Sequence, residues 1–70
     1  MEADVLEKIY LEKLDERIIS KFSAEKNISY EKAMDLYYNS RLAEIIQRGE
    51  YDVQYLDYKI LVDLLSEELS

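Results

Sequence analysis

Residues 28–48 read ISYEKAMDLYYNSRLAEIIQR, and this stretch predicts two short helices joined at a corner. Ser29 and Ser40 stand where the N-cap of each helix belongs, because a serine hydroxyl can accept a hydrogen bond from a free backbone amide of the first turn. Gly49 predicts the end of the second helix, since glycine readily adopts the left-handed conformation that closes helices. We therefore expect one helix on each side of an Asn39-Ser40 corner.

The segment before this stretch, about residues 4–25, predicts one long helix that is apolar on two sides. One side has the i, i+3, i+4 spacing of a helix that faces a core, and it consists of Leu11, Leu14, Ile18 and Phe22. A second group points nearly the opposite way at about 100° per residue, and it consists of Val5, Leu6, Ile9 and Tyr10. Either the helix is interrupted near residue 10, or its N-terminal half contacts another chain.

Residues 50–56 differ from the rest because apolar and polar residues alternate with a period of two. Tyr51, Val53 and Tyr55 alternate with acidic and amide side chains, which is typical of an extended segment. A lone strand is not stable. We therefore expect this segment either to lie across the helices or to pair with its own copy in a dimer.

The last segment, about residues 58–69, predicts a helix that begins after Asp57 as N-cap. It too is apolar on two sides, and Ile60 and Leu64 belong to its second side. Together these patterns predict an all-α fold: a single domain over residues 1–70, with four helices and a short extended segment at about 51–55. Two helices with surplus apolar surface in so small a chain predict a homodimer.

Composition narrows the possible functions. The 70 residues include no Cys and no His, which excludes disulfides and leaves no ordinary acid–base triad, thiolate nucleophile or structural zinc site. We expect no enzymatic activity and no cofactor. A net charge of −7 makes nucleic acid and anionic membranes unfavourable partners. No apolar run is long enough for a membrane span and residues 1–4 lack a basic signal region, so we expect a cytoplasmic protein.

Two carboxylate pairs at helical spacing, Glu12 with Glu16 and Asp63 with Glu67, are candidates for metal-assisted chemistry. Such pairs are common on solvated acidic helices, so they do not predict a metal site. The seven tyrosines favour core and interface positions, because tyrosine combines a large apolar body with a polar tip.

A helix-turn-helix regulator that contacts DNA through residues 41–55 is the alternative function. Arg41 and Arg48 would then face phosphates or bases. Glu44 and Glu50 lie beside these arginines, and the whole chain is acidic. The electrostatic attraction that DNA binding needs is therefore weak.

Residues 33–40, AMDLYYNS, resemble the A-[LM]-D-L-[FY]-Y-N-S motif of a family of small proteins of unknown function, mostly from Gram-positive bacteria. The resemblance covers roughly residues 15–69. Met34 replaces the usual leucine and Tyr37 the usual phenylalanine, while Asp57-Tyr58 stands where the family often has Ser-Pro. Members are similar to proteins found near toxin-like or mobile-element genes, so the resemblance implies an accessory or antitoxin-like role and no functional residues.

We therefore predict a non-enzymatic protein–protein interaction module that forms a homodimer and can bind a partner with a basic surface. The residues predicted to form its interfaces are Val5, Leu6, Ile9, Tyr51, Val53, Tyr55, Ile60 and Leu64.

Overall fold

The computed structural model describes residues 2–70, with the side chains of all of these except residues 2–4 and 51. Its elements are α1 (Glu2–Lys26), α2 (Tyr30–Tyr38), α3 (Arg41–Arg48), the 3-10 helix η1 (Glu50–Tyr55) and α4 (Tyr58–Leu69). No strand occurs among the described residues. The prediction of a small all-α fold with four helices is confirmed.

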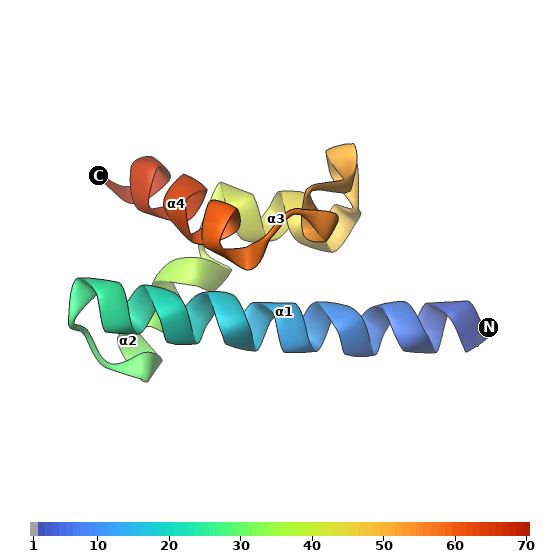
Figure 1. Ribbon diagram of the computed structural model, residues 1–70, viewed down its shortest axis with the longest axis horizontal. Coiled ribbons are helices and arrows are strands. Elements are labelled where there is room, and N and C mark those ends of the chain that lie inside the picture. Colours follow the sequence, from blue (N-terminus) through green and yellow to red (C-terminus); the bar gives the residue numbers. More distant parts are fainter. Residues whose placement is uncertain (1) are drawn as a thin grey trace.

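The long helix α1 runs the length of the molecule (Figure 1). The described chain measures 38 × 21 × 20 Å along its principal axes, and the longest of these matches a helix of this length at about 1.5 Å per residue. α2 crosses the C-terminal half of α1, and its end reaches the side on which α3 and α4 lie (Figure 1). The first turns of α1 extend beyond the rest of the chain (Figure 1).

The ends of α2 and α3 coincide with the predicted capping residues. Ser29 Oγ accepts a hydrogen bond from the backbone amide of Lys32 at 3.0 Å, and Ser40 Oγ accepts one from that of Ala43 at 3.1 Å. Gly49 ends α3 in the left-handed conformation, with a φ of 70°. These contacts fix the corner between α2 and α3, so the predicted helix–corner–helix is confirmed.

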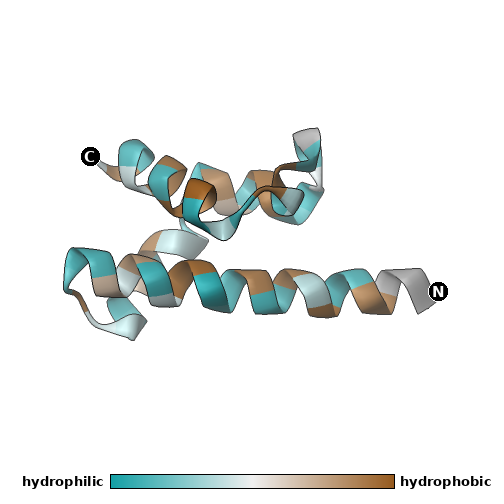
Figure 2. Cartoon of the chain, in the orientation of Figure 1, coloured by the Kyte–Doolittle hydropathy of each residue, from teal (hydrophilic) through white to brown (hydrophobic). Residues whose placement is uncertain are grey.

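The core lies where the C-terminal half of α1 meets the three shorter helices. Its largest fully buried side chains come from all four helices, and they are Tyr37, Ile18, Ile19, Ile46, Leu61, Leu65 and Val62. In Figure 2 hydrophobic segments are present on α3, on α4 and on the part of α1 beside them. The apolar stripe predicted for α1 therefore faces this core.

The prediction of an extended segment at 51–55 is wrong, because residues 50–55 form the 3-10 helix η1. Left-handed residues at Gly49 and Asp52, with φ of 70° and 52°, coil the chain tightly instead of extending it. Three residues per turn bury different side chains from those that a strand would bury. Gln54 is 3% exposed, whereas Tyr55 is 64% exposed.

Of the two alternatives for the N-terminal half of α1, the interruption near residue 10 is wrong, since the helix is continuous from Glu2 to Lys26. It ends before Asn27, which adopts the left-handed conformation with a φ of 56°. The backbone amide of Ile28 then donates to the carbonyl oxygen of Ser23 at 3.0 Å, as in a Schellman motif. A continuous α1 leaves its N-terminal apolar group away from the core.

The start of α3 has a second cap that comes from the far end of the chain. The carboxylate of Glu68 in α4 accepts hydrogen bonds from the backbone amides of Arg41 at 2.6 Å and of Leu42 at 3.0 Å. A carboxylate at a helix N-terminus satisfies free amides and opposes the positive end of the helix dipole. This contact joins α4 to α3.

Glu68→Ala is expected to lower the free energy of unfolding by about 1 kcal/mol, because two amides of α3 lose a charged acceptor. Urea unfolding at low micromolar protein concentration measures the effect. Glu67→Ala is the matched control on the same helix, and its effect should be much smaller. Equal losses in the two variants would contradict a capping role for Glu68.

Candidate interaction surfaces

The N-terminal part of α1 carries the first exposed apolar surface, which we call the arm and define as Val5, Leu6 and Ile9. These side chains are 59%, 67% and 46% exposed. Hydrophobic segments lie on the edge of this part of α1 that faces away from the other helices (Figure 2). The structure therefore brings these three predicted interface residues together on one exposed surface.

Two tyrosines join α1 to η1 next to the arm. The hydroxyl of Tyr10 donates to the backbone oxygen of Gln54 at 2.8 Å. The rings of Tyr10 and Tyr55 lie 5.9 Å apart at a tilt of 34°, a favourable aromatic arrangement. Tyr55 stays exposed, but Val53 is partly buried and packs against the core. Tyr51, also predicted to be at an interface, lies outside the described side chains.

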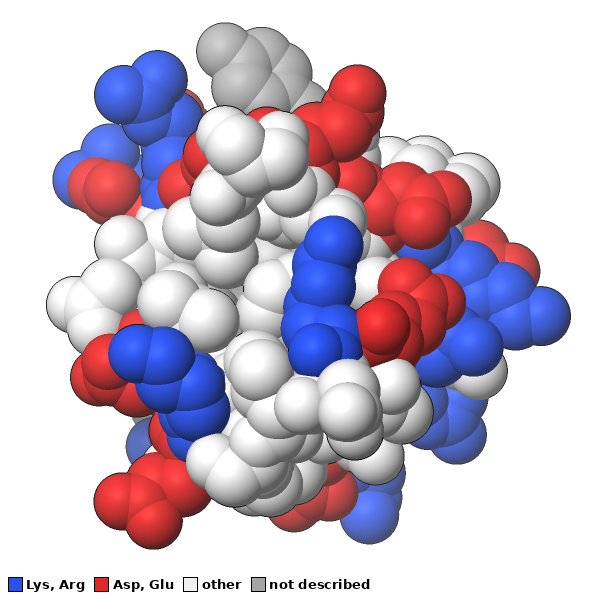
Figure 3. All heavy atoms as spheres, turned by 90° about the vertical axis from the view of Figure 1, so that its left-hand side faces the viewer, with Lys and Arg blue, Asp and Glu red and all other residues white. Residues whose placement is uncertain are grey.

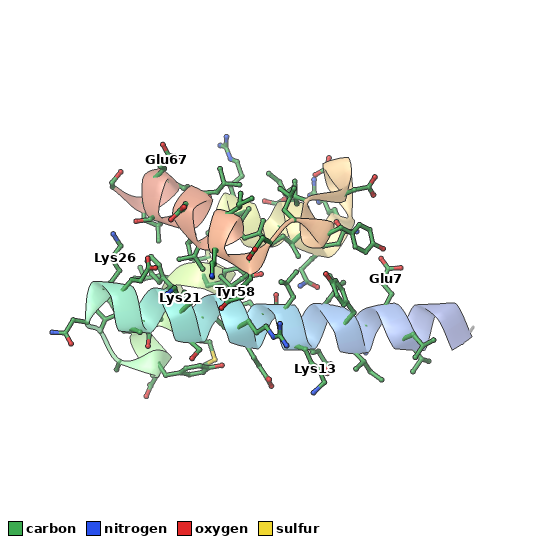
Figure 4. The ribbon with its side chains drawn as sticks, in the orientation of Figure 1. Glu7, Lys13, Lys21, Lys26, Tyr58 and Glu67 are labelled. Carbon is green, nitrogen blue, oxygen red and sulfur yellow. The ribbon has the colours of Figure 1, made fainter. Side chains whose placement is uncertain are left out.

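The outer side of α4 carries the second exposed apolar surface. Ile60 is 48% exposed and Leu64 is 39% exposed, although their neighbours Leu61 and Leu65 are fully buried. In Figure 4 the labelled Glu67 on the same helix points away from α1. The end of the molecule shown in Figure 3 has acidic and basic side chains close together around uncharged ones. Lys59, Asp63 and Glu67 are exposed beside Ile60 and Leu64, so this side of α4 is a mixed apolar and charged surface.

A buried polar cluster links α1, α2 and α3. Asp15 is 5% exposed, and its carboxylate accepts hydrogen bonds from the Tyr37 hydroxyl at 2.6 Å and the Gln47 amide at 3.2 Å. Burial raises the pKa of Asp15 above its ordinary value, although these hydrogen bonds act in the opposite direction. Burial and the Asp15 carboxylate likewise raise the pKa of Tyr37. We assign this cluster a role in joining the helices.

The sequence analysis did not identify Asp15 as buried. The signal was present in helical spacing, because residue 15 lies between Ile19 and Phe22 on the inner face of α1 at about 100° per residue. Its hydrogen-bond donors come from 22 and 32 residues further along the chain. Those partners depend on how the helices pack, which spacing alone does not give.

Replacing Asp15 changes how stability depends on pH. Burial raises the pKa of Asp15 in the folded state. Asp15 therefore contributes most to stability below the pKa that it has in the unfolded chain, and this contribution is lost as pH rises through its raised pKa in the folded state. Asparagine cannot titrate, so the stability of Asp15→Asn relative to the wild type is expected to rise from pH 4 toward neutral pH. Urea unfolding of both proteins across this range measures it. A relative stability that falls with pH would contradict the shift.

The Arg48 side chain and the N-terminal amides of α3, two groups that DNA binding would use, are engaged within the chain. Arg48 forms an ion pair with Glu44 at 2.7 Å along α3. The first amides of α3, which could otherwise bind a phosphate, donate to the carboxylate of Glu68. The residues after Gly49 form η1 rather than an extended wing. This geometry does not favour DNA binding by a helix-turn-helix.

The two candidate carboxylate pairs lie on exposed helix surfaces. All four side chains, Glu12, Glu16, Asp63 and Glu67, are exposed. Within the described part of the chain, no group of three or more acidic, His or Cys residues is arranged to hold a metal ion. The pairs therefore have the surroundings of ordinary surface carboxylates.

Comparison with known proteins gives no match to a family model, a curated protein or a solved structure. The resemblance of residues 33–40 to a bacterial family therefore stays a prediction. Among residues 2–70, no helix combines the length and the apolar character needed to cross a membrane.

Proposed function

We propose that the protein is a non-enzymatic protein–protein interaction module that self-associates and also binds another protein. The observation that carries this proposal is the exposure of apolar side chains on the arm and on the outer side of α4. An apolar surface gains free energy when a partner removes it from water, at roughly 25 cal/mol per Å². Clustered exposed apolar residues are therefore typical of contact sites.

The two surfaces are far enough apart to serve different partners. The arm extends at the end of the molecule that bears the N-terminus, and α4 lies toward the opposite end (Figure 1). One surface can thus be covered by a second copy while the other stays free. The net charge of −7 favours a partner with a basic surface, which is compatible with an accessory or antitoxin-like role.

Site-specific photo-crosslinking in the cells that produce the protein tests the binding of another protein. A photoreactive amino acid at position 6, where Leu6 is 67% exposed, should form a covalent adduct with a protein other than this chain. The matched control places the same photoreactive group at the exposed Lys32 in α2. No adduct at position 6, or identical adducts at both positions, would contradict the proposal.

The DNA-binding alternative makes a different prediction. It requires a gel shift at low salt that is lost when Arg41 and Arg48 are replaced, because phosphate contacts weaken with rising salt. We expect no shift with any DNA tested. A shift that depends on these arginines would replace the proposed function.

A further inference from the structure

Two neighbouring rows of side chains run along the exposed side of α4. Ile60 and Leu64 form an apolar row at a spacing of four residues, and Lys59, Asp63 and Glu67 form a charged row at the same spacing. Residues four apart lie above one another on a helix, and those three apart lie in adjacent rows. The charged row therefore borders the apolar row along its whole length.

The charged row has both signs, and its members are available to a partner. Lys59, Asp63 and Glu67 are exposed and make no ion pair within the described part of the chain. By contrast, the i, i+4 pair Glu44 and Arg48 in α3 is closed at 2.7 Å. A second chain could thus neutralise this row without breaking an existing ion pair.

We propose that a second copy of this chain covers this surface, with the two α4 helices antiparallel across a two-fold axis near residue 62. Ile60 of one copy then packs against the partner's Leu64, and the same contact repeats by symmetry. At 1.5 Å per residue, Lys59 lies about 3 Å along the axis from both the partner's Asp63 and the partner's Glu67. Each lysine therefore meets two carboxylates of the other copy.

Self-complementarity distinguishes α4 from the arm. In an antiparallel helix pair each flank meets the same flank of the other copy. The flank of α4 beside the apolar row carries one basic and two acidic residues. Asp63 lies about 3 Å along the axis from the partner's Asp63, but the four lysine–carboxylate approaches at the same distance outnumber this single repulsion, so the flank attracts itself. Beside the arm, the flank of α1 carries Lys8. An antiparallel pair that packs Val5 against the partner's Ile9 would place Lys8 about 3 Å along the axis from the partner's Lys8. That arrangement would oppose like charges, which leaves the arm for a different protein.

This inference rests on the self-association in the proposed function and specifies its geometry. Each copy contributes only two large apolar side chains, so the interface is smaller than the standard of about 800 Å² per partner. We therefore expect a weak dimer with a dissociation constant on the order of 10–100 μM.

Sedimentation velocity over a concentration series tests the geometry. Lys59→Glu should weaken dimerisation about tenfold, because each introduced glutamate faces two carboxylates of the other copy. Lys59→Glu combined with Asp63→Lys and Glu67→Lys should restore it, since the opposite charges meet again. Ile60→Asp should weaken it by about 30-fold or more. Lys32→Glu on α2 has the same charge change away from this surface and should leave dimerisation unchanged.

Circular dichroism of each variant shows whether the helical fold is retained, as expected for exposed positions. A wild-type dimer that is unaffected by Lys59→Glu and Ile60→Asp would overturn the α4 geometry but leave self-association standing. Failure of the triple variant to recover would overturn the proposed charge pairing. A wild-type chain that stays monomeric would overturn the self-association itself, and with it this inference.

Discussion

Leu65→Ala is expected to remove a large share of the protein's free energy of unfolding, about 3 kcal/mol. Leu65 is fully buried on α4, at the centre of a core that all four helices share. Removing a buried leucine side chain to the β-carbon costs about 3 kcal/mol, through lost burial and the cavity left behind. A domain of this size has a total stability of roughly 4–10 kcal/mol, so the loss is a large share of it.

The adjacent Leu64 gives a matched control, because it is the same residue type on the same helix and is 39% exposed. Leu64→Ala should cost less than about 1 kcal/mol. Urea unfolding followed by circular dichroism at low micromolar concentration, below the range of self-association, compares the two variants. Similar losses for both would show that α4 does not pack as described.

Tyr37→Phe is expected to lower the free energy of unfolding by about 1–3 kcal/mol. The ring of Tyr37 can stay in place, but its hydroxyl no longer donates to the carboxylate of Asp15 at 2.6 Å. Asp15 is then a buried carboxylate that keeps only the longer bond from Gln47. Leaving a buried charged acceptor partly unsatisfied costs more than the bond itself is worth.

A double-mutant cycle separates this contact from general disturbance of the core. If the hydroxyl acts through the carboxylate, Tyr37→Phe should cost clearly less in an Asp15→Asn background than in the wild type. Tyr30→Phe serves as a control on the same helix, because Tyr30 is 44% exposed. Additive losses from Tyr37→Phe and Asp15→Asn would argue against a coupled pair.

Local signals in the sequence were sufficient for the helices and for where they begin and end. Ser29, Ser40 and Asp57 each accept a hydrogen bond from a backbone amide in the first turn of the following helix. Asn27 and Gly49 adopt the left-handed conformation at helix ends. These features depend on residues within about four positions of one another, which is why sequence spacing predicts them.

Contacts between distant residues could not be predicted in the same way. The cap that Glu68 provides for α3 joins residues 26 and 27 positions apart, and the bonds to Asp15 span 22 and 32 positions. The alternation at 50–56 was misleading because left-handed residues at Gly49 and Asp52 coil the chain into η1. A period of two indicates a strand only when the backbone is extended.

The predicted interface residues divide according to their positions in the fold. The arm residues and the pair Ile60 and Leu64 are exposed as the prediction requires. Val53 packs against the core instead, because a 3-10 turn separates it from Tyr55, which a strand would have placed on the same face. The surface available for partners is therefore on α1 and α4 more than on the segment between α3 and α4.

Sedimentation velocity of the wild-type chain up to several hundred micromolar tests the central claim of an interaction module most directly. We predict a concentration-dependent shift from monomer to dimer, and a smaller shift at each concentration for Ile60→Asp. A single monomeric species at all concentrations for both proteins would contradict self-association.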